Sequence, residues 1–347
     1  MPYYSKLRKW KQKDRTRTIE HIMPLRRSLQ SSVPTRTVRD TLLLATWNLR
    51  DFDSNKFGHG PRLPESYYYI AEVISAFDLV AVQEVNRDLG PFEDVMYILG
   101  PNWSYITTDV TEGRSGNNER MTFVYDTRKV WFKNVAGEIV LPKNTLVADD
   151  RQFARSPYIV DFQSGWLKFS LCTVHLYYGS TSGEGYERRV AEIEKIGKFL
   201  AKRVKKEKIN MILLGDMNIV APNDKTMQAL KRTGFVVPDG LALPTNMLRN
   251  KYYDQIAFFY KRDELELGNS EKNAGVFKVF ESVFRPKESE IYYPLGKHNG
   301  KWPETPEKRK KYFQKEWRTW QISDHLPLWI ELKIDFTEKY LTRIKRS

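Results

Sequence analysis

The sequence predicts an α/β fold in which buried strands and amphipathic helices alternate along one large domain. Short apolar runs of strand length recur along the chain, as at Met211–Leu214, and are typical of strands buried on both faces. Segments with apolar residues at helical spacing separate them, as at 70–77 and 186–206. With 347 residues, 41% of them hydrophobic, the chain is long enough to bury a substantial core.

The apolar run 211–214 ends in polar residues. Gly215 breaks it, and Asp216 and Asn218 follow with one residue between them. Alternate residues of an extended segment point the same way, so this carboxylate and carboxamide can share one pocket. The competing interpretation is an Asx turn at an ordinary strand end, because Gly, Asp and Asn are frequent turn residues.

The same pattern recurs at five other strand ends. The polar residues are Asn48 after 41–47, Glu84 after 78–82, His175 after 169–174, Asp254 before 255–260, and Asp324 with His325 before 326–332. Convergence of these ends predicts an acidic, oxygen-rich site flanked by imidazoles. Such donors suit Mg²⁺ or Mn²⁺ better than zinc.

These strand ends carry short motifs in a fixed order. They are N-L-R at 48–50, Q-E-V at 83–85, T-V-H-L at 173–176, G-D-M-N at 215–218 and S-D-H-L-P at 323–327. The ordered set resembles the endonuclease/exonuclease/phosphatase superfamily from about Leu42 to Leu332. The T-V-H-L motif is similar to the deoxyribonuclease I, sphingomyelinase and inositol-phosphatase branches, whereas abasic-site endonucleases carry a Tyr-containing motif there. The resemblance implies a four-layer α/β sandwich with two stacked mixed β-sheets flanked by helices.

The resemblance also implies which residues bind metal and phosphate. Glu84 is expected to hold a divalent ion, Mg²⁺ with Mn²⁺ or Ca²⁺ as alternatives, with Asn48 and Asp324 as further ligands. Asn48, Asn218 and Arg155 are expected to orient the phosphate. Arg155 lies in an R-S-P segment that matches the family's phosphate-binding arginine, and a guanidinium can contact two oxygens at once.

Two His–carboxylate pairs complete the implied catalytic site. The pairs are His175 with Glu119 and His325 with Asp254, one imidazole serving as general base and the other as general acid. Asp216 is expected to position water or bond a catalytic histidine, and Asn218 to assist it. Which histidine takes which role stays open at the level of the sequence.

The implied activity is metal-dependent phosphodiester hydrolysis, most directly by an endonuclease acting on DNA. A net charge of +14 favours such a polyanionic substrate. Anionic lipid head groups also attract cations, so a phosphoinositide or sphingolipid phosphoesterase is the alternative. A non-catalytic nucleic-acid-binding module is the third interpretation, and the complete set of catalytic positions argues against it. DNA versus RNA, endo versus exo action and oligomeric state stay open.

Three segments organise the chain. Residues 1–38 form a basic arm, which either lies along phosphates or packs on the domain, before a catalytic domain at 39–335 and a tail at 336–347. A charged insertion at about 261–320 mixes aromatic residues with cations. That mixture suits unstacked bases, and it equally suits an amphipathic helix packed on the domain.

Other features bound the protein's class. Residues 1–30 contain no apolar signal region, and no apolar run reaches membrane-spanning length, so we expect a cytoplasmic protein. The single cysteine, Cys172, excludes an internal disulfide. His59 lies in a glycine-containing loop and is expected at the surface.

Overall fold

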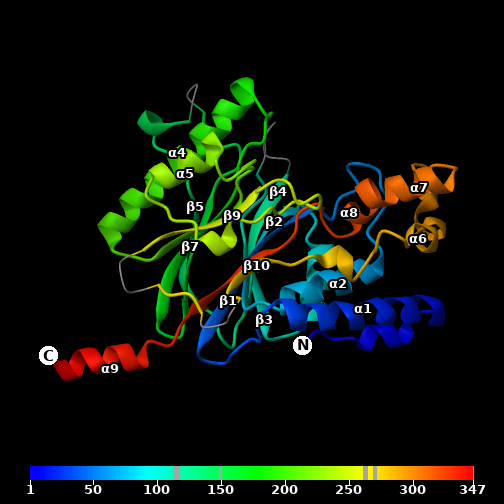
Figure 1. Cartoon of the computed structure of the whole chain (residues 1–347), viewed down its shortest axis with the longest axis horizontal. Coiled ribbons are helices and arrows are strands. Elements are labelled where there is room, and N and C mark those ends of the chain that lie inside the picture. The colour runs from blue at the N-terminus through cyan, green and yellow to red at the C-terminus, as the bar shows by residue number, and fades with distance from the viewer. Residues whose placement is uncertain (112–117, 148–150, 261–264, 269–271, 347) are drawn as a thin grey trace.

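A computed structural model describes residues 1–111, 118–147, 151–260, 265–268 and 272–346. Two β-sheets stack face to face, and helices cover their outer faces (Figure 1). The predicted four-layer α/β sandwich is therefore confirmed. In the described part of the chain, none of the helices is both long enough and apolar enough to cross a membrane.

The first sheet has six strands and the second has five. The first sheet runs in the order β10 (Ala274–Val276), β11 (Leu328–Lys333), β1 (Thr41–Phe52), β2 (Leu79–Asn86), β4 (Glu119–Asp126) and β3 (Trp103–Thr107). The second runs β5 (Trp131–Glu138), β6 (Tyr158–Ser164), β7 (Leu167–His175), β8 (Met211–Asp216) and β9 (Asp254–Phe259). Each sheet has one parallel pair, β1 with β2 and β7 with β8, so both are mixed.

The strand registers bring the polar strand ends together. Asn48 of β1 lies opposite Gln83 of β2, one residue before Glu84. In the second sheet, Asp216 of β8 lies opposite both His175 of β7 and Asp254 of β9. Each sheet therefore presents its polar residues at one edge.

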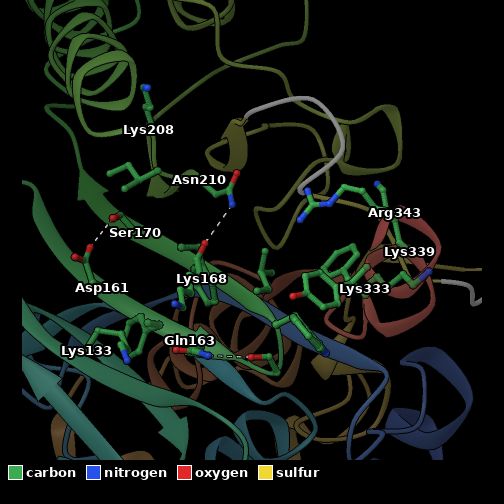
Figure 2. Close-up of a pocket in the computed structure, with 18 of the residues that line it drawn as sticks. Lys133, Asp161, Gln163, Lys168, Ser170, Lys208, Asn210, Lys333, Lys339 and Arg343 are labelled. Atoms are coloured by element: carbon green, nitrogen blue, oxygen red, sulfur yellow. Dashed lines mark hydrogen bonds between the residues drawn. The ribbon is translucent and has the colours of Figure 1, made fainter. Parts of the chain in front are cut away.

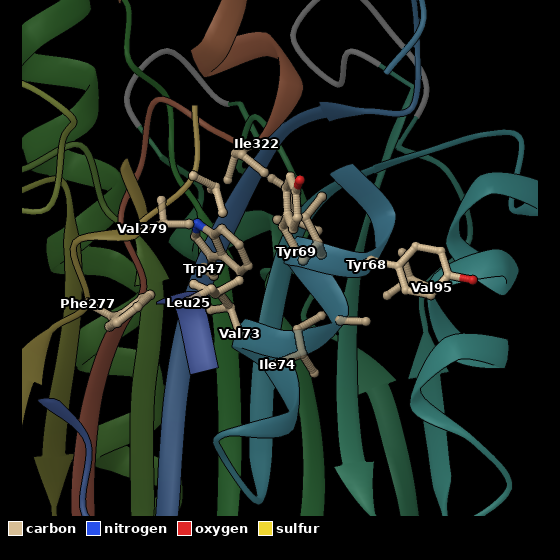
Figure 3. Close-up of a cluster of buried hydrophobic side chains, with 14 of the residues drawn as sticks. Leu25, Trp47, Tyr68, Tyr69, Val73, Ile74, Val95, Phe277, Val279 and Ile322 are labelled. Carbon is tan, nitrogen blue, oxygen red and sulfur yellow. The ribbon is translucent and has the colours of Figure 1, made fainter. Parts of the chain in front are cut away.

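Three apolar clusters hold the layers together. The sheets pack on each other through side chains such as Leu44, Phe123, Phe162 and Leu214. The outer face of the second sheet is covered by α4 (Gly183–Glu207) and α5 (Lys225–Arg232). The outer face of the first sheet packs against α1 (Gln12–Ser32), α2 (Pro64–Ser75) and α3 (Gly90–Leu99), in the cluster around Trp47 and Val73 (Figure 3).

Shorter helices complete the chain. They are α6 (Ser289–Gly296), α7 (Pro306–Tyr312), α8 (Arg318–Gln321), α9 (Thr337–Arg346), a π-helix at Phe313–Trp317, and 3₁₀ turns at Ser5–Lys9, Lys143–Thr145, Asp239–Leu241, Val279–Glu281 and Lys297–Asn299. Helix α9 projects from the body of the molecule at the C-terminal end of the structure (Figure 1).

The basic N-terminal segment packs on the domain. Leu7, Ile22, Leu25 and Leu29 are buried in the cluster that covers the first sheet. Of the two interpretations of residues 1–38, the structure therefore supports packing over an arm along phosphates. The apolar residues of α1 return every three or four positions, which gives the helix one buried face.

The insertion is also packed rather than splayed. Trp302, Phe313, Trp317 and Trp320 are buried, which leaves their rings inaccessible to nucleic-acid bases. Within the span 261–320, β10 pairs with β11 and so belongs to the first sheet itself. The packed-helix interpretation of this segment therefore fits the structure.

His59 corrects one expectation, because it is buried and not at the surface. Its Nδ1 lies 2.8 Å from the hydroxyl of Tyr312, and its ring lies 5.7 Å from that of Trp320. Burial lowers the pKa of His59 to about 4. The expectation was wrong because the insertion folds over this loop, which local sequence does not reveal.

A buried ion pair fastens α1 to the insertion and gives a pH-dependent prediction. His21 Nε2 lies 3.1 Å from Glu288 Oε1. Burial alone would lower the pKa of His21, but its hydrogen bonds to Glu288 and to the Arg17 carbonyl raise it above 6.5. Burial alone would raise the pKa of Glu288, but His21 and Arg285 lower it below 4.5. The pair therefore stabilises most between pH 4.5 and 6.5, and the His21 contribution is lost as pH rises through its folded pKa.

We expect His21→Gln to lower the free energy of unfolding by roughly 1–3 kcal/mol near pH 5.5, because a buried charged partner is lost. Near pH 8.5 the loss should be clearly smaller, since His21 is then less protonated in the wild type. Urea unfolding at the two pH values measures the difference. Exposed His298→Gln is the control. An equal loss at both pH values would contradict the prediction.

Candidate active site

Asn48 connects the two sheets at the centre of the site. Its Nδ2 donates to Glu84 Oε1 at 2.7 Å and to Asp216 Oδ2 at 3.2 Å. Its Oδ1 accepts from the backbone amide of Arg50 at 2.8 Å. The carboxamide thus presents its NH₂ group, a donor, to two carboxylates. Ligation of a cation by Asn48 would require this carboxamide to rotate.

Glu84 lies in β2, after the apolar residues of that strand. Its backbone takes a left-handed conformation, with φ of 62°. Burial raises the pKa of its carboxyl, but His175 and the hydrogen bond from Asn48 bring that pKa down to about 2. The backbone amide of Asp51 also donates to Glu84 Oε2, at 2.6 Å. Glu84 is therefore ionised at neutral pH and suited to hold a cation.

Asp216 is buried where β8 ends, and its two oxygens have different partners. Oδ1 accepts from the backbone amide of Asn218 at 2.9 Å, which is the Asx turn that the sequence suggested. Oδ2 lies 3.6 Å from His175 Nε2 and 3.7 Å from His325 Nε2. The same carboxylate therefore forms the Asx turn through Oδ1 and faces both imidazoles through Oδ2. Burial raises the pKa of this carboxyl.

Gly215 makes the position of Asp216 attainable. Its φ is +125°, and a Cβ at this position would lie 2.2 Å from the carbonyl oxygen of Val174. Only glycine fits such an approach between β7 and β8. Asn218, with φ of 53°, then donates from Nδ2 to the Leu176 carbonyl at 2.9 Å, which ties the loop to β7.

The two predicted His–carboxylate pairs are both present. His175 Nδ1 lies 3.1 Å from Glu119 Oε2, and His325 Nδ1 lies 2.8 Å from Asp254 Oδ2. Each pair joins one sheet to the other, since Glu119 and Asp254 come from β4 and β9. The carboxylates occupy Nδ1 and leave Nε2 of both rings facing Asp216.

The two imidazoles have opposite electrostatic surroundings. Burial, and next the charge of Arg155, lowers the pKa of His175 to about 4. Burial acts the same way on His325, but Asp254 and Asp216 outweigh it and raise the pKa of His325 well above 6.5. The surroundings of the two rings therefore shift their pKa values in opposite directions.

Arg155 and Asp324 lie at different depths. Arg155 is buried and forms an ion pair with Glu119, and its Nη1 lies 3.5 Å from the His175 carbonyl. Burial lowers its pKa. The Asp324 side chain is 47% exposed and lies 3.8 Å from Arg50 Nε. It lies outside the group of ligand atoms described next, and its role as a metal ligand stays a prediction.

Three side chains have the geometry to hold a divalent ion. Glu84, His175 and Asp216 each offer one ligand atom, and these atoms lie within 4.8 Å of one another. Two carboxylate oxygens and one imidazole nitrogen suit Mn²⁺ and also admit Mg²⁺. Of the two predicted carboxylate ligands, Glu84 belongs to this group and Asp324 does not, while Asn48 contacts two of its members.

Two features of the site were missed in the sequence. Asp51 lies near the end of β1, and its carboxyl has a raised pKa because of burial and the nearby Glu84. The spacing N-L-R-D, with an acid three residues after Asn48, was the available signal. The second feature is a pair of tyrosines, here called the tyrosine wall, which no sequence motif predicts.

The tyrosine wall consists of Tyr178 and Tyr253 beside His325. The Tyr253 ring lies 5.5 Å from the His325 ring and 6.3 Å from that of Tyr178. Buried Arg189 fixes the Tyr178 loop by donating to the carbonyls of Tyr178 at 3.0 Å and Ser180 at 3.1 Å. Tyr253 thus lies next to the imidazole, and Tyr178, which is 44% exposed, lies beside Tyr253.

No protein-family model matches the sequence, and none of the curated proteins matches it. Solved structures do match. An endonuclease/exonuclease/phosphatase family protein from Bacteroides thetaiotaomicron has a TM-score of 0.54 and 17% identity, covering 85% of this chain and 96% of its own. A mannosyl-6-phosphatase from the same organism has a TM-score of 0.53 and 18% identity, covering 84% and 99%.

A conserved protein of unknown function from Enterococcus faecalis has a TM-score of 0.54 and 15% identity, covering 84% of this chain and 99% of its own. At such identities the likeness shows the fold alone. That fold agrees with the ordered motifs and with the strand-end site. The chain therefore has the fold of the endonuclease/exonuclease/phosphatase superfamily.

Proposed function

We propose that this protein is a divalent-metal-dependent phosphodiester hydrolase. One observation carries the proposal: two imidazoles, each bonded through Nδ1 to a carboxylate, direct Nε2 to within 3.7 Å of the same Asp216 oxygen. A site with two such proton carriers beside candidate cation ligands is suited to general acid–base hydrolysis.

Hydrolysis of a phosphodiester needs an activated water, neutralised phosphoryl charge and a protonated leaving oxygen. A bound Mg²⁺, Mn²⁺ or Ca²⁺ would supply positive charge at a non-bridging oxygen. Glu84 would hold it together with a rotated Asn48, because His175 Nε2 and Asp216 Oδ2 serve the protons and the water in this proposal. Asn218 and Arg155 lie beside these groups and are the proposed phosphate contacts.

The histidines move the protons in this proposal. Glu119 and Asp254 fix the imidazole rings, so that Nε2 of each ring is presented to the substrate. One ring accepts the proton of the attacking water, and the other donates a proton to the leaving oxygen. Asp216, in reach of both rings, holds the water between them.

We expect His175→Ala and His325→Ala each to lower kcat by about 10²- to 10⁴-fold, the usual contribution of a positioned acid or base. The double variant should lose little more, because groups that act as a unit are not additive. The measurement is metal-dependent hydrolysis of bis(p-nitrophenyl) phosphate, with thermal unfolding as the check on folding.

His298→Ala is the matched control, because this histidine is exposed and lies in the insertion. It should retain full activity. Folded His175→Ala and His325→Ala proteins that keep wild-type turnover would support a non-catalytic binding module instead.

We expect EDTA to abolish hydrolysis and Glu84→Gln to weaken Mn²⁺ binding by about tenfold or more, since a charged ligand is replaced by a neutral one. Calorimetric titration with Mn²⁺ measures binding without any turnover. Exposed Glu307→Gln is the control and should bind as the wild type does. Unchanged affinity in Glu84→Gln would place the ion elsewhere.

The proposed substrate is DNA. Support comes from the net charge of +14 and from the tyrosine wall, whose faces suit an unpaired base next to a scissile phosphate. A phosphoinositide head group would use the charge but has no planar group to stack on the aromatic faces.

We expect nicking of supercoiled plasmid with Mg²⁺ or Mn²⁺, and no head-group release from phosphoinositide or sphingomyelin vesicles. Agarose electrophoresis and phosphate or phosphocholine release measure the two activities. Tyr178→Ala should weaken DNA cleavage but leave bis(p-nitrophenyl) phosphate turnover unchanged. Head-group release from vesicles without any nicking would favour the lipid substrate.

A further inference from the structure

A large cleft lies far from the candidate active site. Its volume is about 1490 Å³, and it lies between β6, β7 and helix α9 (Figure 2). Lys168, near the start of β7, lines it, whereas His175 ends the same strand. Seven residues of extended chain span roughly 23 Å, so the cleft and the active site are at opposite ends of the second sheet.

The cleft exists because α4 stops before the sheet does. The side chains of β7 alternate, so Leu167 and Phe169 face the core while Lys168 and Ser170 face outward. Helix α4 ends at Glu207, and Lys208 turns away with a left-handed φ of 56°. Beyond that turn the outer face of the sheet is polar and is left uncovered by the helix.

The lining of the cleft is strongly basic. Its cations are Lys133, Lys168, Lys208, Lys333, Lys339, Arg343 and Arg346, and its carboxylates are Asp161 and Glu338. Lys333 and Lys339 share Glu266, at 3.6 and 2.9 Å. Lys133, Lys168 and Lys208 are exposed and make no ion pair with any residue that the structure describes. The cleft therefore carries uncompensated positive charge.

Exposed aromatic rings stand at the edge of the cleft. Trp166, in the β6–β7 turn, is 50% exposed, and Tyr340 of α9 is 41% exposed. Their ring centroids are 5.2 Å apart, and Trp166 Nε1 donates to Thr337 Oγ1 at 3.2 Å. The indole is thus held in place with a large part of its surface open to a planar ligand.

We propose that this cleft binds a segment of single-stranded nucleic acid. Its phosphates would lie along Lys133, Lys168 and Lys208, and a base would stack on the Trp166–Tyr340 pair. A cationic groove with adjoining aromatic faces is the arrangement that binds such strands without sequence preference. The concave shape favours a strand over a membrane, which needs protruding residues. The inference goes beyond the proposed hydrolysis and does not depend on it.

The test measures binding of a fluorescein-labelled oligothymidine to the full chain in EDTA, by anisotropy at several salt concentrations. In the triple variant Lys133→Gln, Lys168→Gln, Lys208→Gln, the slope of log K against log salt should become less steep by about 2. This is about 0.7 for each lost phosphate contact. The matched triple variant Lys9→Gln, Lys11→Gln, Lys13→Gln removes the same charge from the N-terminal segment, and should leave the slope unchanged.

Trp166→Ala tests the stacking contact. It should weaken binding by about 5- to 100-fold with an unaltered salt slope, because a stacked base and no phosphate contact is lost. Trp166→Phe keeps a ring and should recover part of the affinity. A loss of affinity that is equal in both variants would overturn the stacking contact.

Two outcomes overturn the cleft as a whole. One is an equal loss of slope in both triple variants, which would make the binding a diffuse charge effect. The other is loss of binding to phosphatidylserine vesicles, with oligothymidine binding unchanged, in the cleft variant. Failure of the catalytic proposal can be distinguished from failure of the cleft proposal. The first appears as absent turnover by the wild type, whereas binding to the cleft is measured in EDTA, without turnover.

Discussion

The structure depends on the buried carboxylate of Asp216 at the junction of the two sheets. Asp216 belongs to β8, but its Oδ2 accepts from Asn48 of β1 at 3.2 Å. The two His–carboxylate pairs add two further links between the sheets. An ionised group without partners is costly to bury, so the sheets must stack in the one register that supplies donors. Fold and candidate site therefore constrain each other.

Much of this arrangement could be predicted from the sequence, because it follows from local rules. Apolar runs predict the strands, and parallel neighbours bring their polar ends to one edge, which assembles His175 with Asp216. The imidazole–carboxylate pairing required the family resemblance. Asp51 had a signal in the N-L-R-D spacing, whereas Arg189 could not be predicted, because its contacts depend on the conformation of the loop at 178–180. The prediction that His59 lies at the surface was wrong because residues more than 200 positions away in the sequence bury it.

Aromatic residues among cations show where sequence patterns are ambiguous. Trp302 and Trp317 lie among lysines and arginines, as residues that stack on bases do, yet both are buried in the first sheet's outer cluster. Trp166 has a less suggestive sequence context and is half exposed. Composition is the same for a packed helix and for a nucleic-acid surface. Tertiary burial separates the two, and local sequence does not encode it.

The two ends of β7 differ in charge, and this difference explains why a bound cation would affect substrate binding as well as catalysis. At its C-terminal end, the carboxylates of Glu84 and Asp216 lie close together beside His175. At its start, the Lys168 cleft is basic, and the whole chain carries a net charge of +14. The basic cleft and the net positive charge attract a polyanion to the protein, whereas the carboxylates of Glu84 and Asp216 repel it. A divalent ion at the carboxylates would remove that repulsion, so productive binding and catalysis would require the same ion.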